Sequence, residues 1–279
     1  MSTVLITGCS SGFGLLTALQ LGRRGHRVVA TMRRPARDEV LSRAVRDENL
    51  PVAILALDVC DAAQVTDVVA RAQREHGALD VLINNAGVEL RSSIEDAAED
   101  DIRRQFDTNV FGAVRMVQAV LPAMRERRAG TIVNVSSIAG LVSRPYGGFY
   151  AASKHALEAI SEALHYEVAP FGIRVALIEP GQYATRLLDN AWNGRRFTPA
   201  SPYWERSALF DERIKRLVPE GQRADPDEVA RMICEAALGE QPGLRRLAGG
   251  DAKMIAGAYR QLDFEAFEQS MRQALDWWD

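Results

Sequence analysis

The chain has 279 residues, 47% of them hydrophobic, so it is long enough to bury a sizeable core in one large α/β domain or two small ones. Its 34 Lys and Arg against 37 Asp and Glu give a formal net charge of -3, which argues against nucleic acid or an anionic membrane as the main partner. Three cysteines without paired spacing indicate a reducing compartment. With no apolar run near the ~20 residues of a membrane span and no leader-like start, we expect a cytoplasmic protein.

Short apolar runs alternate with helical patterns along the chain. The runs that predict strands lie at residues 3–7, 27–31, 52–59, 81–84, 131–135 and 173–179, with a last candidate at 244–248. Helical patterns follow the first strand and recur at residues 37–47, 62–75, 99–124 and 149–168. Strands that are apolar throughout indicate a parallel sheet with helices on both faces, and right-handed crossovers make it doubly wound. We therefore predict a single α/β domain over residues 1–279 with about seven strands.

Residues 182–218 differ in character from the rest of the chain. They follow the sixth strand, near the sheet edge where ligands bind in such folds. A helical lid over an apolar substrate would need their aromatic composition, but a helical subdomain that packs its own aromatic residues would also explain it. The chain closes on Trp277 and Trp278, which should pack on this domain or on a partner subunit. The aromatic residues of the insertion are Tyr183, Trp192, Phe197, Tyr203, Trp204 and Phe210.

The first strand runs into a glycine-rich turn, GCSSGFG, that opens the first helix. A turn without Cβ atoms lets backbone N–H groups approach a pyrophosphate, and the helix N-terminus adds partial positive charge. The spacing GxxxGxG is not the usual G-x-G-x-x-G, and a tight structural turn would also explain it. The strand-loop-helix context favours a Rossmann-type dinucleotide site. Its candidate residues are Gly8, Ser10, Ser11, Gly12, Phe13 and Gly14.

The end of the second strand bears on the choice of cofactor. An NAD site places Asp or Glu there, about 20 residues beyond the glycines, to hold the adenosine ribose. Here the chain has Arg33 and Arg34 instead of an acid. A carboxylate would repel a 2′-phosphate, whereas Arg can pair with it in bidentate fashion. The sequence therefore favours NADP(H) over NAD(H), with Arg33 the better candidate and a solvated Arg34 as the alternative.

Two further strand ends offer residues to a cofactor. Asp58 can accept a hydrogen bond from the adenine amino group while Val59 contacts the ring, or Asp58 caps the helix that starts after Asp61. The segment Asn84–Gly87 has small residues that leave room for the cofactor and Asn side chains that can tie neighbouring strands together. A plain strand-to-loop turn is the alternative. The candidates in this segment are Asn85, Ala86 and Gly87.

The stretch from residue 131 to residue 154 carries the chemistry. Its strand ends in Ser136 and Ser137, and the helical pattern that follows carries Tyr150 and Lys154 on one face, four residues apart. A phenol beside an ammonium group, facing a hydroxyl, forms a proton-transfer site. Because a free Tyr titrates near pH ~10 and a neighbouring Lys favours the phenolate, we expect a lowered pKa for Tyr150.

Taken together, these motifs resemble the short-chain dehydrogenase/reductase family over nearly the whole chain. TGCSSGFG resembles the family's TGxxxGxG loop, NNAG its fourth-strand motif and YAASK its YxxxK, with Ser137 thirteen residues before Tyr150. Asn109, in DTNVFG, matches the family's Asn in the long helix. PGQYAT resembles the PGxxxT segment that touches the nicotinamide, and it adds Pro180, Gly181 and Thr185 to the cofactor candidates. With ATMRRP, the glycine loop is most similar to the hydroxysteroid and retinol dehydrogenase branch.

The resemblance implies four catalytic roles. Tyr150 gives a proton to the carbonyl oxygen as hydride arrives from the cofactor, and Ser137 hydrogen-bonds that oxygen. Lys154 holds the ribose hydroxyls, so it and Tyr150 also contact the cofactor. Asn109 orders a water that links Lys154 to bulk solvent, with a structural hydrogen bond at a helix kink as the alternative. Phe13 replaces a smaller aliphatic residue of the family and would reshape the floor under the nicotinamide.

These observations predict an NADP(H)-dependent oxidoreductase that interconverts a hydrophobic secondary alcohol and its ketone, or an alcohol and its aldehyde. The alternative is a non-catalytic NADP(H)-binding sensor or scaffold, against which the intact set of catalytic residues argues. Sugar-nucleotide epimerisation shares the fold and YxxxK, but this chain has no large C-terminal substrate domain. The substrate and the preferred direction stay open.

Two expectations concern metals and subunits. The four histidines have no metal-ligand spacing, so we expect no metal. The helix at 149–168 carries small residues beside its catalytic face, and such helices pair between subunits in the family, which implies a homodimer or homotetramer.

Overall fold

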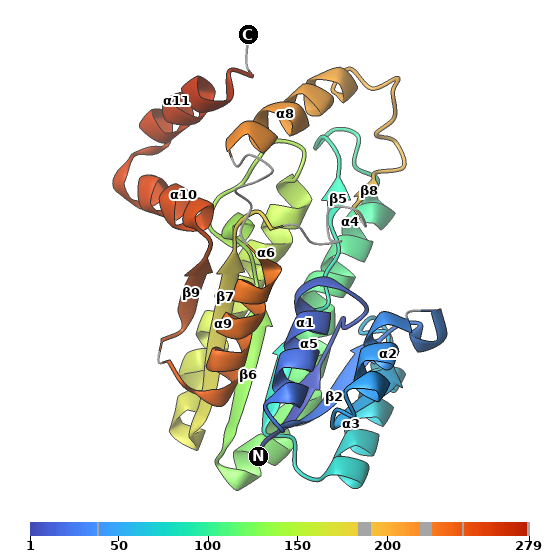
Figure 1. The fold of residues 1–279 in the computed structure, drawn as a ribbon. Helices are drawn as coiled ribbons and strands as arrows, with labels where there is room; N and C mark the ends of the chain where they lie inside the picture. Colours follow the sequence, from blue (N-terminus) through green and yellow to red (C-terminus); the bar gives the residue numbers. More distant parts are fainter. Residues whose placement is uncertain (38, 184–190, 218–224, 242, 278–279) are drawn as a thin grey trace.

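The computed structural model of the chain describes residues 1–37, 39–183, 191–217, 225–241 and 243–277. Its centre is a seven-stranded parallel sheet in the order β3-β2-β1-β4-β6-β7-β9 (Figure 1). The strands are β1 (Thr3–Ile6), β2 (Arg27–Met32), β3 (Val52–Ala56), β4 (Val81–Asn84), β6 (Gly130–Val135), β7 (Ile173–Pro180) and β9 (Arg245–Ala248). The chain builds the sheet outward from β1 to one side and then from β4 to the other. This order confirms the predicted doubly wound sheet.

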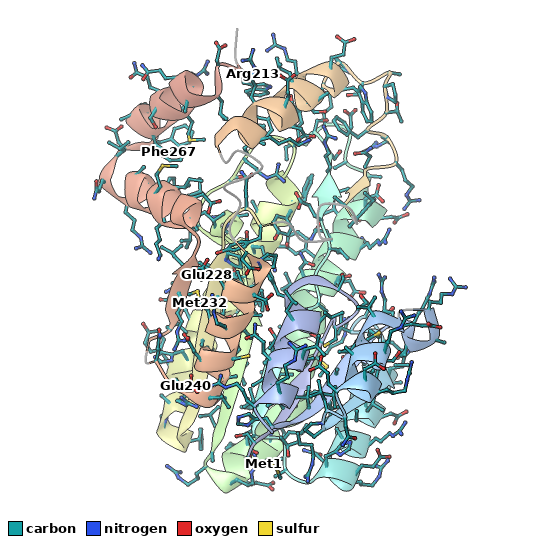
Figure 2. All side chains as sticks on the ribbon, viewed as in Figure 1. Met1, Arg213, Glu228, Met232, Glu240 and Phe267 are labelled. Atoms are coloured by element: carbon teal, nitrogen blue, oxygen red, sulfur yellow. The ribbon has the colours of Figure 1, made fainter. Side chains whose placement is uncertain are left out.

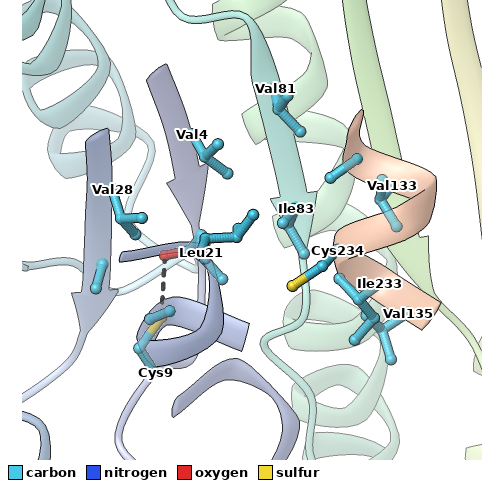
Figure 3. Close-up of a cluster of buried hydrophobic side chains, with 14 of the residues drawn as sticks. Val4, Cys9, Leu21, Val28, Val81, Ile83, Val133, Val135, Ile233 and Cys234 are labelled. Carbon is cyan, nitrogen blue, oxygen red and sulfur yellow. Dashed lines mark hydrogen bonds between the residues drawn. The ribbon is translucent and has the colours of Figure 1, made fainter. Parts of the chain in front are cut away.

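Helices cover both faces of the sheet because successive strand residues point to opposite sides. On β1, Val4 and Ile6 pack in one buried cluster and Leu5 in the other. Figure 3 shows Leu21 of α1 and Ile233 of α9 in the first cluster. The first face carries α1 (Gly12–Arg23), α2 (Glu39–Asp47) and α9 (Pro226–Leu238), on which Glu228 and Met232 are labelled in Figure 2. The second face carries α3 (Ala62–His76), α5 (Gly112–Arg127) and α6 (Gly148–Val168).

The remaining elements gather beyond the carboxyl ends of the strands (Figure 1). They are α4 (Glu99–Phe106), α8 (Trp204–Leu217), α10 (Gly250–Gln261), α11 (Phe264–Leu275) and a small parallel sheet of β5 (Leu90–Arg91) and β8 (Trp192–Asn193). In a doubly wound sheet this is the edge where ligands bind. Within the described ranges, no helix combines the length and apolarity that a membrane span needs.

Aromatic residues of the 182–218 insertion pack on the loop that precedes α6. Phe197 and Phe210 are each 1% exposed, and their ring centroids lie 6.0 and 6.2 Å from that of Tyr146. Trp277 packs in the same cluster, with its ring centroid 5.3 Å from that of Phe210. This residue therefore packs within its own chain. Trp278 lies outside the described residues. The described part of the insertion therefore packs aromatic residues together with Tyr146 and Trp277.

Two boundaries and several elements differ from the prediction. The helix expected over 99–124 is interrupted by a π-helical turn, Asp107–Phe111, between α4 and α5, and no Pro or Gly within that turn marks the break. The strand expected over 52–59 ends at Ala56 because its partner β2 ends at Met32, the residue that pairs with Ala56. The helices α9, α10 and α11 were not predicted, nor was the small β5–β8 sheet.

Candidate active site

The three proton-transfer groups meet at the carboxyl end of β6. Tyr150 lies in the first turn of α6 and Lys154 one turn further, with exposed fractions of 6% and 5%. The Lys154 Nζ lies 5.8 Å from the centroid of the Tyr150 ring. Ser137 follows β6, its Oγ accepts from the Ala139 N–H at 3.1 Å, and it lies close enough to the Tyr150 phenol to lower the pKa of that group. The structure thus brings together the groups that the sequence predicted.

Burial moves the pKa values of Tyr150 and Lys154 in opposite directions. For Tyr150, burial raises the pKa above its usual value and the Glu89 carboxylate adds to this, while the Ser137 hydrogen bond and the Arg144 charge lower it. The predicted lowering of the Tyr150 pKa is therefore wrong here, because desolvating the phenolate outweighs the favourable neighbours. Burial lowers the pKa of Lys154 to about 8, against the Glu158 and Glu89 charges. At pH 7 the phenol is protonated and the ammonium group is largely charged.

Asn109 hydrogen-bonds the backbone of the segment that lies beside Lys154. It lies in the π-helical turn, and its Oδ1 accepts from the Val88 N–H at 2.9 Å while its Nδ2 donates to the Val88 carbonyl at 3.0 Å. The neighbouring Gly87 lies beside both groups: a Cβ there would make ordinary contacts, 3.6 Å from the Asn109 Oδ1 and 3.9 Å from the Lys154 Nζ. The structural role of Asn109 is thus present, and its role with a water stays a prediction.

Sequence reasoning missed the residues that support this segment. Gln105 accepts from the Leu90 N–H at 2.6 Å and donates to the Val88 carbonyl at 2.8 Å. Ser153, between the catalytic residues of α6, accepts from the Asn109 Nδ2 at 3.1 Å. Glu89, 4% exposed, forms an ion pair with Arg144. Their positions beside NNAG and YAASK were the available signal, but their partners lie 15 to 55 residues away in the chain.

The glycine loop is packed as a cofactor cradle requires. Gly8 has a φ of 74°, and a Cβ on Gly14 would lie 2.6 Å from the Gly8 carbonyl oxygen. The Asn85 Nδ2 closes the loop by donating to the carbonyls of Thr7 at 2.9 Å and Gly8 at 3.0 Å. Ser11 precedes α1 as its N-cap, yet its side chain makes no capping hydrogen bond. The loop N–H groups and this hydroxyl fit an anion at the helix N-terminus.

The other candidates of this loop and of the first strand ends lie around the same edge. Ser10 and Gly12 flank Ser11 in the turn, and the Phe13 ring packs edge-on against Tyr183 with centroids 5.7 Å apart. Arg33 and Arg34 directly follow β2 and are exposed, so both can reach a phosphate.

Asp58 and Val59 follow β3, and the structure decides against Asp58 as the helix cap. The cap of α3 is Asp61, whose side chain accepts from the backbone N–H of Ala63 and Gln64. Asp58 instead accepts from the Cys60 N–H at 3.0 Å. Val59 packs closely on Gly112, since a Cβ on Gly112 would lie only 2.7 Å from the Val59 Cγ2.

The ends of β4 and β7 complete the edge. The backbone N–H groups of Asn85 and Ala86 both donate to the Thr7 Oγ1 at 3.0 Å, which fixes the NNAG turn to β1. The Ser137 Oγ donates to the Pro180 carbonyl at 3.5 Å, and the Gly181 N–H donates to the Ala248 carbonyl at 2.9 Å. Thr185 lies outside the described residues. In the part of the chain that is described, no group of three or more His, Cys, Asp and Glu could hold a metal.

Comparisons with known proteins agree with this geometry. Residues 2–196 match the family model for short chain dehydrogenase. The 3-ketodihydrosphingosine reductase of Bacteroides thetaiotaomicron is 39% identical over 88% of this chain and 87% of its own length. The human retinol dehydrogenase 8 is 37% identical over 88% of this chain and 80% of its own length.

Solved structures are similar in both fold and sequence. A short-chain dehydrogenase from Streptomyces avermitilis superposes with a TM-score of 0.80 at 35% identity, over 99% of this chain and 97% of the other. A gluconate 5-dehydrogenase from Burkholderia cenocepacia, in complex with NADP and tartrate, superposes with a TM-score of 0.75 at 27% identity, over 91% and 95%.

Thr7 stabilises the NNAG turn beside the site, and this role can be tested. Replacing Thr7 with Val keeps the shape but leaves the N–H groups of Asn85 and Ala86 without their acceptor, so we expect the free energy of unfolding to fall by about 1–3 kcal/mol. Urea titration measures this loss. Thr7→Ser keeps the hydroxyl and should retain most of the stability. Equal stability of Thr7→Val and the parent chain would contradict the assigned role.

Proposed function

Because the chain belongs to the short-chain dehydrogenase family, we propose that it is an NADP(H)-dependent oxidoreductase that interconverts a hydrophobic secondary alcohol and its ketone, or an alcohol and its aldehyde. The observation that carries this proposal is the convergence of Ser137, Tyr150 and Lys154 beside a glycine loop that fits a dinucleotide. A non-catalytic sensor or scaffold would not need these groups together with Asn109, and nothing in the site favours it.

The proposed mechanism assigns one task to each side chain. The nicotinamide, when bound, supplies or accepts the hydride. Tyr150 is protonated at neutral pH, so its phenol donates the proton to the substrate oxygen during reduction. The Ser137 hydroxyl, which acts on the same phenol, stabilises the negative charge that builds on that oxygen. Lys154 holds the ribose hydroxyls and stabilises the phenolate that remains.

A small cavity supports the proposed return of the proton. It measures about 10 Å³, lies among Asn84, Asn109 and Val135, and has room for about one water. The Lys154 Nζ donates to the Val135 carbonyl at 2.8 Å, so the ammonium group contacts the same wall. We propose that Asn109 orders a water in this cavity, which passes protons from solvent to Lys154 and then to Tyr150.

The cofactor proposal follows the carboxyl edge of the sheet. Residues Gly8–Gly14 would hold the pyrophosphate, Asp58 and Val59 the adenine, and the segments 85–87 and 180–181 the nicotinamide side. Arg33, supported by Arg34, would pair with the 2′-phosphate, which favours NADP(H). The similar gluconate 5-dehydrogenase was solved in complex with NADP, which supports the same choice here.

The proposed substrate is apolar because of what covers the site. Tyr146, four residues before the catalytic tyrosine, contacts Phe197, Phe210 and Trp277, with ring centroids 6.0 to 6.2 Å away. We infer that the 182–218 insertion acts as a lid built on this aromatic cluster. Two relatives are named for 3-ketodihydrosphingosine and for retinol, both apolar compounds with a carbonyl or hydroxyl group.

Tyr150→Phe tests the mechanism. It removes the proton donor and keeps the ring, so we expect kcat/KM with NADPH and apolar ketones to fall by about 10²–10⁴-fold while NADPH binding persists. The matched control is Tyr259→Phe, since Tyr259 lies on α10 and is 43% exposed. Initial rates over a ketone panel measure the effect. Full turnover by Tyr150→Phe, or no turnover by the parent chain on any ketone or alcohol, would contradict the proposal.

Arg33→Asp tests the phosphate pocket. The new carboxylate would repel the 2′-phosphate and accept from a free ribose hydroxyl, so the preference for NADPH over NADH should fall by about 10–100-fold. Arg34→Asp should have the smaller effect. Arg46→Asp, an equal charge change on the exposed side of α2, should have none. The ratio of kcat/KM for the two cofactors is the measurement, and an unchanged ratio in Arg33→Asp would show that the pocket lies elsewhere.

We also propose that the chain forms a homodimer or homotetramer through α6. This helix leaves Ile160 and Tyr166 with 38% and 67% exposure, and the small residues Ala152 and Ala163 are exposed beside them. Light scattering at micromolar concentration should give a multiple of 30.7 kDa, and Ile160→Lys should reduce it. A monomeric parent chain would refute this assembly.

We also propose a cytoplasmic location, which is supported by three cysteines that are free in the structure.

A further inference from the structure

Two carboxyl groups are buried directly behind the catalytic lysine. Glu158 follows Lys154 by one turn of α6, so both side chains share a helix face. Glu179 lies next to the end of β7. Their exposed fractions are 5% and 0%. Carboxylates are almost never buried to this degree without a partner, so the pair needs an explanation.

A single arginine serves both carboxyl groups. The Arg245 Nε, on β9, lies 3.0 Å from the Glu158 Oε2 and 3.7 Å from the Glu179 Oε1, while its Nη2 lies 2.6 Å from Glu162 at the surface. The Arg260 charge of α10 acts on Glu179 as well. The guanidinium group is thus shared among three carboxyl groups, and it offers Glu179 only a distant contact.

The remaining carboxyl oxygens have no donor. Among the described residues, neither oxygen of Glu179 nor the Glu158 Oε1 has a hydrogen-bond partner. Both carboxyl groups lie against the same Arg245 Nε, at 3.0 and 3.7 Å, so they are buried close to one another. Two negative charges buried at one site disfavour double ionisation, which favours a proton on one of them. Burial first, and the Glu158 charge second, raise the pKa of Glu179 to about 7, so Glu179 is the better candidate for that proton.

The pair is also tightly enclosed next to the turn that carries Ser137. A Cβ on Gly140 would lie 2.9 Å from the Glu158 Cγ and 2.8 Å from the Ser136 Oγ. Glu158 and Ser136 therefore both pack directly against this glycine. The other charge that acts on Lys154 is Glu89, which is paired with Arg144. Glu158 is the charge that acts on Lys154 from α6 itself, one helical turn away, although Arg245 shares its Oε2.

We propose that Glu158 and Glu179 share one proton and that Glu158 is a positioning residue, whose retained negative charge keeps the buried Lys154 in its ammonium form. The charges then balance: the singly protonated pair offsets Lys154, and Arg245 is offset by Glu162. This inference rests on the proposed function only for the task of Lys154. The charge state itself is a property of the fold and can be measured without turnover.

The first test follows the lysine directly. The chain has lysines only at positions 154, 215 and 253, so ¹³Cε-lysine labelling gives few NMR signals, which K215R and K253R assign. In the parent chain Lys154 should titrate near pH 8. In Glu158→Gln its midpoint should fall by about one pH unit, because an opposite charge is lost. Glu167→Gln is the matched control, with the same change at an exposed position of the same helix, and should leave the midpoint unchanged. An unchanged midpoint in Glu158→Gln overturns the proposal.

The second test follows the shared proton and holds even if Glu158→Gln fails to fold. A carboxyl group whose folded pKa is raised stabilises the protein below its unfolded pKa and loses that contribution as pH rises toward its folded pKa, here between about pH 4.5 and 7. Gln at position 179 mimics the protonated form at every pH. Glu179→Gln should therefore gain melting temperature relative to the parent chain as pH rises from 5 to 8. A melting-temperature difference that stays constant with pH overturns the proposal.

Catalytic assays separate this inference from the proposed function. If the parent chain is active, the activity of Glu158→Gln should decline at a lower pH than that of the parent chain as pH is raised. The reason is that Lys154 loses its proton at a lower pH in the variant. If the parent chain reduces no ketone but Lys154 shifts as expected, the proposed function fails and the inference holds. If the parent chain is active and the Lys154 midpoint does not move, the inference fails alone.

Discussion

The site depends on keeping a lysine charged inside the protein. Burying an ammonium group costs several kcal/mol unless hydrogen bonds and opposite charges compensate for lost water. Lys154 has one such hydrogen bond, to the Val135 carbonyl at 2.8 Å, and the charges of Glu158 and Glu89 act on it from two sides. The end of β6, the β4–α4 connection and the face of α6 must therefore stay in fixed relative positions for the group to remain charged.

A buried polar network supplies that fixed geometry. The Asn84 Nδ2 donates to the Asn134 Oδ1 at 2.9 Å across β4 and β6, and the Asn134 Nδ2 donates to the Ser161 Oγ of α6 at 2.8 Å. One chain of hydrogen bonds thus links two central strands to the catalytic helix. The Asn84 Oδ1 has no hydrogen-bond partner among the described residues, but any slip of a strand or of α6 would break the other bonds of the network, which permits few alternative arrangements. This network confirms the prediction that Asn side chains tie neighbouring strands. The side chain that does so is that of Asn84, which donates to Asn134 on the next strand.

Much of this arrangement is encoded locally and could be predicted from sequence. The apolar runs predicted the sheet because each central strand is buried on both faces, and the spacing of Tyr150 and Lys154 fixed their shared face. The π-helical turn at Asn109 escaped prediction because its cause is tertiary: Asn109 bonds Val88, 21 residues away. The raised pKa of Tyr150 escaped for a similar reason. Charge neighbours can be read from spacing, whereas the depth of burial depends on how segments distant in the chain pack around the ring.

The opposite pKa shifts of the phenol and the ammonium group bear on how one site can work in both directions. Reduction needs a protonated Tyr150, and burial supplies this form at neutral pH. Oxidation needs the phenolate, which forms only where a positive charge offsets the burial. Lys154 is the cationic group one turn away on the same helix. Its pKa is lowered to about 8 with Glu158 in place, and without Glu158 we expect it to lose its charge at a lower pH. The buried carboxyl pair would therefore matter most for oxidation. In that direction the Lys154 charge must stabilise the Tyr150 phenolate before the phenolate can accept the proton of the substrate.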